Sequence, residues 1–210
     1  MGKEVSIIDY GMSNLLSISR AFEHVGATVH IIEKPEEVRN ADYLVLPGVG
    51  AFPDGMKELE ARNLVGPIQE YAASGRPLMG VCLGMQMLLT RGFEYIETNG
   101  LGLIKGEVLP LPRDMKGFKV PNINWHRTYD PGKGNWKDSI FRETENGACF
   151  YFVHSYYAKP DHEEDVLATS QFGDLVFAAA VKRNNVSGTQ FHPEKSGDAG
   201  LELLKNFMDT

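Results

Sequence analysis

Hydrophobic and polar positions over residues 5–90 alternate between strand-like and helix-like patterns. Short apolar runs predict strands at residues 5–9, 28–32, 43–46 and 77–81. Apolar residues at helical spacing predict helices over 54–62, 67–73 and 83–89, and a further one between an N-cap at Ser13 and a stop at Gly26. Strands that alternate with helices are typical of an α/β fold with a doubly wound, largely parallel central sheet.

The pattern changes after Gly100. The apolar runs become shorter and more strand-like, and prolines and glycines separate them; they lie at residues 107–109, 148–153, 166–169 and 175–181. This half predicts an additional antiparallel or mixed strand region attached to the parallel sheet. A last strand over 186–191 and a final helix from near Gly197 follow. Because no repeat or linker interrupts the chain, we expect residues 1–210 to form a single domain.

Composition narrows the possible functions. The chain has 210 residues and a net charge of −7, so its surface gives no electrostatic footprint for nucleic acid. No apolar run approaches the roughly 18 residues that a membrane-spanning helix needs. The two cysteines lack CxxC spacing, and no Cys/His cluster has metal-ligand spacing. We therefore expect a cytoplasmic protein with free thiols that requires no metal or cofactor.

Cys82 lies in the segment Gly80-Val81-Cys82-Leu83-Gly84, between a predicted strand and a predicted helix. This is the pattern of a nucleophile elbow, with sulfur in place of the usual serine oxygen. The turn would place the thiol at a helix N-terminus, which favours thiolate, and would aim the Leu83 N–H at an oxyanion. The alternative is a buried apolar cysteine. Cys149, within an apolar run, fits that alternative, and we assign it to the core.

His192-Pro193-Glu194 follows the last predicted strand and offers a base with an orienting acid. Residues i and i+2 of an extended segment point the same way, so Glu194 can accept a hydrogen bond from His192. Pro193 keeps His192 out of helical conformation. A nucleophile, a base and an orienter are the parts of a catalytic triad. A surface turn with a chance His and Glu is the alternative.

Pro47-Gly48-Val49-Gly50 follows the third predicted strand, at the edge where open α/β sheets bind ligands. Its two glycines let the backbone turn N–H groups toward a ligand. The segment is therefore a candidate for a second oxyanion donor, a group typically worth about 10²–10³ in rate. An ordinary glycine turn explains this fragment equally well.

Taken together, the Cys82 elbow, Pro47–Gly50 and His192–Glu194 resemble the class I glutamine amidotransferases. Within that family the sequence is similar, over essentially its whole length, to glutaminase subunits of imidazole glycerol phosphate synthase. The segments that carry this similarity are Ile8–Gly11 with Asn14, Pro47–Phe52, Phe152–Tyr157 and Gln190–Gly197.

The resemblance implies hydrolysis of L-glutamine to glutamate and ammonia by Cys82 as nucleophile, His192 as base and then acid, and Glu194 as orienter. It implies an oxyanion hole at Val49, Gly50 and Leu83, and glutamine binding by Gly48, Gln86, Ser155 and Tyr156. Gln86 could instead only cap its helix, and Tyr156 could be packing. The implied partner is a (β/α)₈-barrel cyclase, which forms a heterodimer with the glutaminase and uses the ammonia in histidine biosynthesis.

One segment departs from the family pattern. Asn122 stands where the family commonly has His, and Asn124 where it commonly has Gly, in a stretch near the partner interface. A paralogous subunit that feeds ammonia to another synthase, for example one that aminates sugars, therefore stays open. A stand-alone cysteine hydrolase and a non-catalytic binding subunit are further alternatives. We also expect the loop Gly48-Val49-Gly50 to be the gated element of the site.

Overall fold

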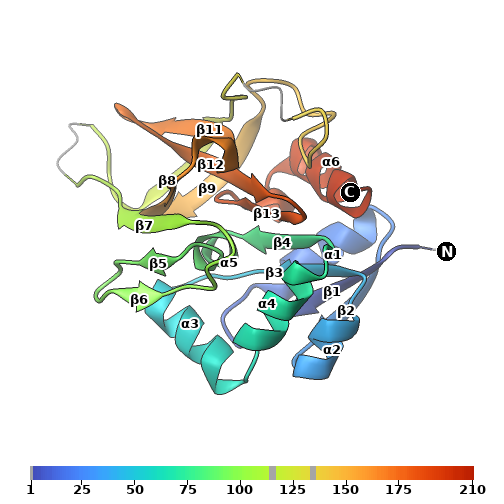
Figure 1. The fold of residues 1–210 in the computed structure, drawn as a ribbon. Helices are drawn as coiled ribbons and strands as arrows, with labels where there is room; N and C mark the ends of the chain where they lie inside the picture. Colours follow the sequence, from blue (N-terminus) through green and yellow to red (C-terminus); the bar gives the residue numbers. More distant parts are fainter. Residues whose placement is uncertain (1, 114–116, 133–135) are drawn as a thin grey trace.

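The computed structural model describes residues 2–113, 117–132 and 136–210 (Figure 1). Within these ranges a central sheet has seven strands in the order β11-β12-β13-β4-β3-β1-β2. They are β1 (Glu4–Ile8), β2 (Thr28–Ile32), β3 (Tyr43–Leu46), β4 (Leu78–Val81), β11 (Val166–Phe172), β12 (Leu175–Arg183) and β13 (Val186–Thr189). Strands β13, β4, β3, β1 and β2 pair in parallel, whereas β11 and β12 are antiparallel. The predicted fold class is therefore confirmed.

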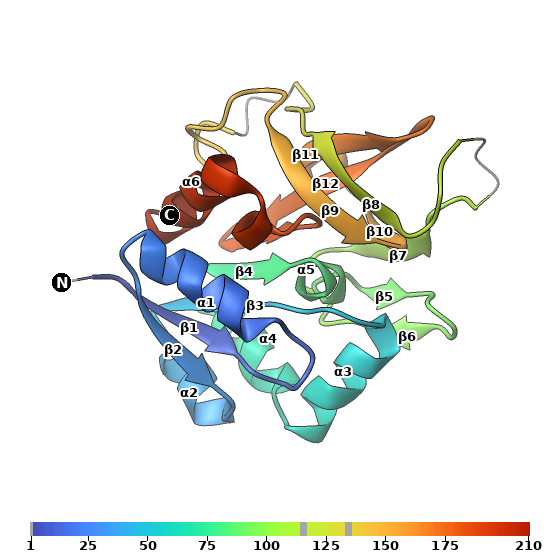
Figure 2. The same ribbon diagram turned by 180° about the vertical axis from the view of Figure 1, so that it is seen from behind.

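Helices cover both faces of this sheet (Figures 1 and 2). On one face lie α2 (Pro35–Asn40), α3 (Phe52–Ala61), α4 (Val65–Ala73) and the short α5 (Leu83–Met87). On the other face, α1 (Leu15–His24) packs beside α6 (Gly197–Met208), as Figure 2 shows. A parallel sheet that is covered on both faces explains why its strands read as continuous apolar runs.

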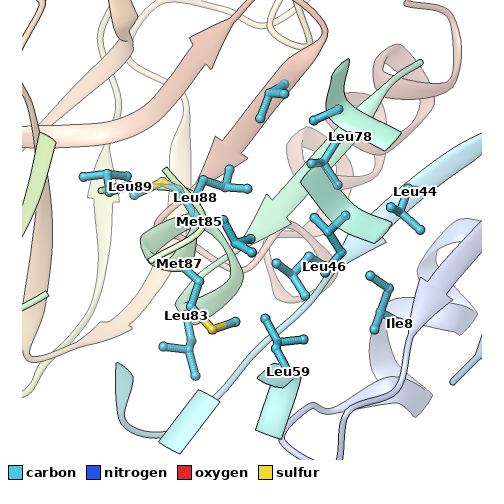
Figure 3. Packing of buried hydrophobic residues seen from close by; sticks show 14 of the residues in the cluster. Ile8, Leu44, Leu46, Leu59, Leu78, Leu83, Met85, Met87, Leu88 and Leu89 are labelled. Carbon is cyan, nitrogen blue, oxygen red and sulfur yellow. The ribbon is translucent and has the colours of Figure 1, made fainter. Parts of the chain in front are cut away.

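Successive residues of each strand serve opposite cores. Leu44 and Leu46 of β3 point into the core under α3 and α4, which Figure 3 shows with Leu59 and Leu83. Val45, between them, belongs to the core under α1 and α6. This two-residue period holds the strands in register, and the register places the carboxyl ends of β3, β4 and β13 side by side.

A second layer of strands follows the parallel part of the chain. The strands β5 (Arg91–Gly92), β6 (Thr98–Asn99), β7 (Gly106–Pro110) and β10 (Tyr156–Pro160) form a small mixed sheet. The antiparallel pair β8 (Asn122–Arg127) and β9 (Cys149–His154), which we call the ribbon, lies beside it. Two 3₁₀ turns, η1 (Glu163–Asp165) and η2 (Pro193–Lys195), complete the described elements.

The elements that the sequence pattern did not predict are short or polar. Helix α2 is only six residues long, and β8 contains two asparagines, which strands disfavour. Strand β10 was also not predicted. Helix α1 begins at Leu15 with Asn14 at its N-cap position, so Ser13 is not the cap. In the described ranges no helix combines the length and hydrophobicity that a membrane crossing requires.

Candidate active site

Cys82 occupies a sharp turn between β4 and α5. Its backbone has φ 54° and ψ −109°, a left-handed conformation that L side chains rarely adopt. The turn closes only because its neighbours are small. A Cβ on Gly84 would lie 1.8 Å from the Leu46 carbonyl oxygen, and one on Gly80 would lie 2.7 Å from the Met85 nitrogen. The predicted elbow geometry is therefore present.

The thiol of Cys82 is enclosed but reaches a cavity. The residue is 7% exposed, and its backbone N–H donates to the Thr189 carbonyl at 2.7 Å, which ties the elbow to β13. The sulfur lies 3.8 Å from the Val153 carbonyl oxygen and 3.8 Å from Nε2 of Gln190. Cys82 therefore contacts both β13 of the central sheet and β9 of the ribbon.

His192 lies three residues after the end of β13 and is hydrogen-bonded to Glu194. Its Nδ1 donates to Oε1 of Glu194 at 2.8 Å, and both side chains are under 5% exposed. The expected contact is present, but the expected reason for it is wrong. Glu194 belongs to the 3₁₀ turn η2 and not to an extended segment, while His192 itself is extended with φ −96° and ψ 99°. The turn that Pro193 begins, and not strand alternation, brings the carboxylate back to the ring.

The backbone of His192 is fixed from two sides. Its N–H donates to the Tyr151 carbonyl at 2.9 Å, and its carbonyl accepts from the Ser196 hydroxyl at 2.6 Å. The same hydroxyl oxygen accepts from the Tyr151 N–H at 3.0 Å. Ser196 therefore joins the histidine to strand β9 of the ribbon.

The ionisation of His192 depends on its two neighbours. Burial lowers the pKa of His192, but the nearby Cys82 and Glu194 outweigh burial and raise that pKa to about 10. Among the described residues, Nε2 of His192 has no hydrogen-bond partner of normal geometry. The ring is therefore charged at neutral pH and carries a hydrogen on both nitrogens.

The backbone donors that the sequence suggested for an oxyanion hole are engaged with protein carbonyls. The N–H of Leu83 donates to the Gly48 carbonyl at 3.3 Å, and the N–H of Val49 donates to the Met12 carbonyl at 2.9 Å. Gly50 has φ 113°, a conformation that favours glycine. Gly48 is also tightly packed, since a Cβ there would lie 2.4 Å from the Tyr10 hydroxyl. A different arrangement of this loop is needed before both N–H groups can face an oxyanion.

A cavity of about 250 Å³ opens above the thiol. Its lining residues are Val49, Gly50, Cys82, Leu83, Gln86, Glu94, Pro121, Val153, His154, Ser155, Tyr156 and His192. Of the residues that the sequence suggested, only Gly48 and Glu194 are outside this lining, and both contact residues within it. The residues that the sequence suggested therefore lie around a single cavity.

Gln86, in α5, lines the cavity and reaches β10. Its Nε2 donates to the Tyr156 carbonyl and to Oε1 of Gln190, each at 2.9 Å. Both amide hydrogens are thus used within the protein. The amide oxygen remains as the group of Gln86 that can accept a hydrogen bond from a ligand.

The sequence reasoning did not assign a role to three polar residues in or beside this cavity, Glu94, His154 and Gln190. Glu94 alone has a carboxylate among the described lining residues, and burial raises its pKa even though the Phe52 N–H donates to it at 2.8 Å. His154 and Gln190 were recognised only within family segments. No local pattern marks Glu94, which lies outside every predicted helix and strand.

Cys149 was assigned to the core, and that assignment is wrong. Cys149 is exposed at the start of β9, whose burial alternates so that Phe150, Phe152 and His154 point inward. The apolar run around Cys149 is therefore half of a two-sided strand.

Known proteins are similar to this chain in sequence and in fold. The family model Glutamine amidotransferase class-I matches residues 6–210. The imidazole glycerol phosphate synthase subunit HisH 1 of Legionella pneumophila (strain Lens) is 44% identical over 208 residues, which cover 97% of this chain and 98% of that protein. The subunit HisH of Moorella thermoacetica is 45% identical over 205 residues, which cover 98% of this chain and 94% of that protein.

Among solved structures, PurLQS from Thermotoga maritima aligns with a TM-score of 0.77 and 20% identity, over 100% of this chain and 99% of the aligned chain. A structure described as a glutamine amidotransferase aligns with a TM-score of 0.73 and 18% identity, over 98% of this chain and 99% of the other. These likenesses support the fold. The family match over nearly the whole length shows that the chain belongs to the class I glutamine amidotransferases.

Proposed function

We propose that this chain is the glutaminase subunit of an imidazole glycerol phosphate synthase in histidine biosynthesis. It hydrolyses L-glutamine to glutamate and ammonia and supplies the ammonia to a cyclase subunit. The observation that carries this proposal is the strained Cys82 beside a buried His192–Glu194 pair, in a chain about 44% identical to HisH subunits.

The first half of the reaction uses Cys82 and His192. The thiolate of Cys82 attacks the side-chain carbonyl carbon of glutamine and forms a tetrahedral oxyanion. His192, charged because Cys82 and Glu194 hold its pKa near 10, gives its Nε2 proton to the departing ammonia. A glutamyl thioester on Cys82 remains, and the neutral imidazole then takes a proton from the attacking water. General acid–base help of this kind is typically worth roughly 10²–10⁴.

The other end of glutamine is held at the end of the cavity that Gln86, Glu94 and Tyr156 line. We assign its α-ammonium group to Oε1 of Gln86 and the Glu94 carboxylate, since these are acceptors that line the space. The Ser155–Tyr156 segment holds the α-carboxylate side. The cavity thus recognises glutamine by its α-amino and α-carboxylate groups, and this binding places the side-chain amide beside the Cys82 sulfur.

The oxyanion loop is the element that controls turnover. Because Val49 N–H is bonded to Met12 and Leu83 N–H to Gly48, the described loop conformation does not offer both donors to an oxyanion. Rearrangement of Gly48-Val49-Gly50 when the cyclase binds its own ligand would release them. Ammonia release by the lone subunit that equals release by the liganded complex would contradict this control.

The partner is a (β/α)₈-barrel cyclase that covers the mouth of the site and forms a heterodimer with this chain. Free ammonia would otherwise protonate and diffuse away. Asn122 and Asn124 leave open a second candidate, a subunit that serves another synthase. Supplying this chain with a histidine-pathway cyclase and with a sugar-aminating synthase, and measuring glutamine-dependent product, separates the two.

The central test compares Cys82→Ala with Cys149→Ala in the complex. We expect Cys82→Ala to lose ammonia release from glutamine by at least about 10⁴-fold, as removal of a covalent nucleophile does. Cys149 is exposed and outside the cavity lining, so Cys149→Ala should keep wild-type activity. Equal activity of Cys82→Ala and wild type would refute the mechanism. Cleavage of γ-glutamyl peptides without any partner would favour a stand-alone hydrolase.

A further inference from the structure

A continuous chain of hydrogen bonds runs from strand β8 of the ribbon to the cavity. Nε2 of His126 lies 2.7 Å from Oδ1 of Asn122, and Nδ2 of Asn122 lies 2.9 Å from Nε2 of His154. Nδ1 of His154 lies 2.9 Å from the Tyr156 carbonyl oxygen, which also accepts from Gln86. These contacts connect residues 32 positions apart, because β8 and β9 pair with Asn122 opposite His154.

The chemistry of these groups allows one direction for every hydrogen bond. The Tyr156 carbonyl can only accept, so Nδ1 of His154 carries a hydrogen. Burial lowers the pKa of His154 to about 4, so the ring is neutral near pH 7 and its Nε2 must accept. Nδ2 of Asn122 donates to it, and Oδ1 of Asn122 is left to accept from Nε2 of His126. Asn122 therefore acts as donor and acceptor at once.

The chain ends on groups that line the glutamine cavity. The Tyr156 carbonyl accepts two hydrogen bonds, one from His154 and one from Gln86, and Gln86 also donates to Gln190 beside the Cys82 sulfur. A shift of the His154 ring would therefore move both Tyr156 and Gln86. Asn122 and His154 are 3% and 6% exposed. If a substitution removed one of them, water could not easily take its place as the hydrogen-bond partner of the other.

We propose that Asn122 is a positioning residue for glutamine. It fixes the tautomer and orientation of His154, which in turn hold the Tyr156 carbonyl and Gln86 in the geometry that binds the amino-acid end of the substrate. The inference rests on the proposed glutaminase function. Asn122 does not touch the reacting atoms; it acts through His154.

The kinetic test uses an isosteric change. Asn122→Asp keeps the size but has no amide hydrogen to give to His154. Asn122→Leu removes both hydrogen bonds. We expect Asn122→Leu to raise the KM for glutamine about tenfold or more in the complex, while kcat changes by less than about threefold. Asn122→Asp should raise the KM by a similar factor only at a pH high enough to deprotonate its His154, because a doubly protonated His154 can donate to the carboxylate. Asn146→Asp is the matched control, since Asn146 is exposed and its Oδ1 accepts from the Asp130 N–H, a bond that Asp also makes; its KM should stay unchanged.

A rescue variant separates hydrogen bonding from packing. In Asn122→His, one ring nitrogen can donate to His154 while the other accepts from His126, which restores the direction of the chain. We expect its KM to return to within about threefold of wild type. An Asn122→His variant as impaired as Asn122→Leu would contradict the proposal.

The second measurement does not depend on activity. Nitrogen-15 NMR of the histidine rings should show His154 with hydrogen on Nδ1 and none on Nε2 across pH 5–8. The groups that face His154 are Asn122 and His126 from β8, His192 beyond β13, and the rings of Phe152 and Phe177. Asn122→Asp places a carboxylate among them, so its His154 should be protonated on both nitrogens near neutral pH.

The outcomes distinguish the two proposals. A wild-type His154 with hydrogen on Nε2, or an unchanged KM in both Asn122→Asp and Asn122→Leu, would overturn the positioning role. If Asn122→Leu does not fold, the Asp variant and the wild-type NMR spectrum still decide. Absence of glutamate release by wild type would remove the proposed function, while the NMR spectra would still test the hydrogen-bond chain.

Discussion

The elbow region and the ribbon each carry one cysteine and one buried histidine, yet the two pairs differ in kind. We define the elbow region as residues 78–87, which include β4, Cys82 and α5, together with the segment His192–Glu194; the ribbon is β8 with β9. The elbow region holds Cys82 and His192 against each other beside a carboxylate, and the pKa of His192 is raised to about 10. The ribbon holds Cys149 in solvent and His154 among amides, and burial lowers the pKa of His154 to about 4.

The difference shows that burial alone does not make a histidine reactive. Burial disfavours the charged form of both rings. Only His192 has partners that favour its charge strongly enough to reverse the effect. The hydrogen-bond partners of His154 are neutral, and no carboxylate of the described residues bonds to it, so it is suited to hold a fixed hydrogen-bond pattern. The ring of His192 is therefore suited to the proton transfer that we propose for it, and that of His154 to holding a wall of the cavity in place.

The largest expected effect is on kcat. It comes from giving His192 a neutral hydrogen-bond partner, as His154 has. Glu194→Gln replaces the carboxylate with a neutral amide and removes one of the two groups that raise the pKa of His192. That pKa should therefore fall, and kcat for glutamate release should drop by about 10²–10⁴-fold. Steady-state kinetics and NMR titration of the His192 ring measure the two effects. An unchanged kcat would mean that the carboxylate is not needed.

A glycine of the elbow gives the next largest effect, on stability. A Cβ on Gly84 would overlap the Leu46 carbonyl oxygen at 1.8 Å, and backbone cannot yield as a flexible side chain does. Gly84→Ala should lower the free energy of unfolding by roughly 3 kcal/mol or more, measured by urea denaturation. Gly66→Ala is the matched control, because in the described part of the chain no atom beyond its neighbours and its own helix backbone lies within 4 Å of its Cβ position in α4. It should stabilise the protein by up to about 1 kcal/mol. Equal losses in both variants would show that the elbow is not sterically constrained.

These two regions also explain what the sequence could predict. The elbow depends on residues close together in the chain: glycines around Cys82, and a proline between His192 and Glu194. Local spacing therefore located them, even though Glu194 reaches the ring through a 3₁₀ turn and not by strand alternation.

The ribbon depends on contacts between distant residues. Asn122 meets His154 only because β8 and β9 pair in one register, and β8 contains residues that disfavour strands. Glu94 reaches the cavity from a segment without any periodic pattern. Neither tertiary pairing nor side-chain hydrogen bonding leaves a local signal, so these residues could not be found from spacing.

The pKa of His154 predicts a pH-dependent loss of stability. Its folded-state pKa is about 4, below the ordinary value of 6.5, so between these values the unfolded chain binds more protons than the folded one. Stability is therefore lost as pH falls from 6.5 to 4, by about 3 kcal/mol from this group. Urea denaturation of wild type and His154→Gln at several pH values measures the difference in slope.

A matched control shows whether the effect belongs to burial. His24 is exposed in the last turn of α1, so His24→Gln is the matched histidine replacement, and its stability at each pH is compared with that of His154→Gln. If His154→Gln lost stability between pH 6.5 and 4 as steeply as wild type, the buried neutral ring would not be the cause. The ribbon would then differ less from the elbow region than we infer.

The smallest expected effect is at the hydrogen bonds that join the two regions. The buried Ser196 hydroxyl donates to the His192 carbonyl at 2.6 Å and accepts from the Tyr151 N–H at 3.0 Å. Ser196→Ala leaves both backbone groups without this partner, and it should lower the free energy of unfolding by about 1–2 kcal/mol. Because the Glu194 contact remains, kcat should fall only a few-fold. Ser74→Ala is the control. The exposed Ser74 hydroxyl also donates to a backbone carbonyl, that of Tyr71 at 2.7 Å, but water can replace this bond. A loss of kcat in Ser196→Ala as large as that in Glu194→Gln would show that the ribbon positions the base as strongly as the carboxylate does.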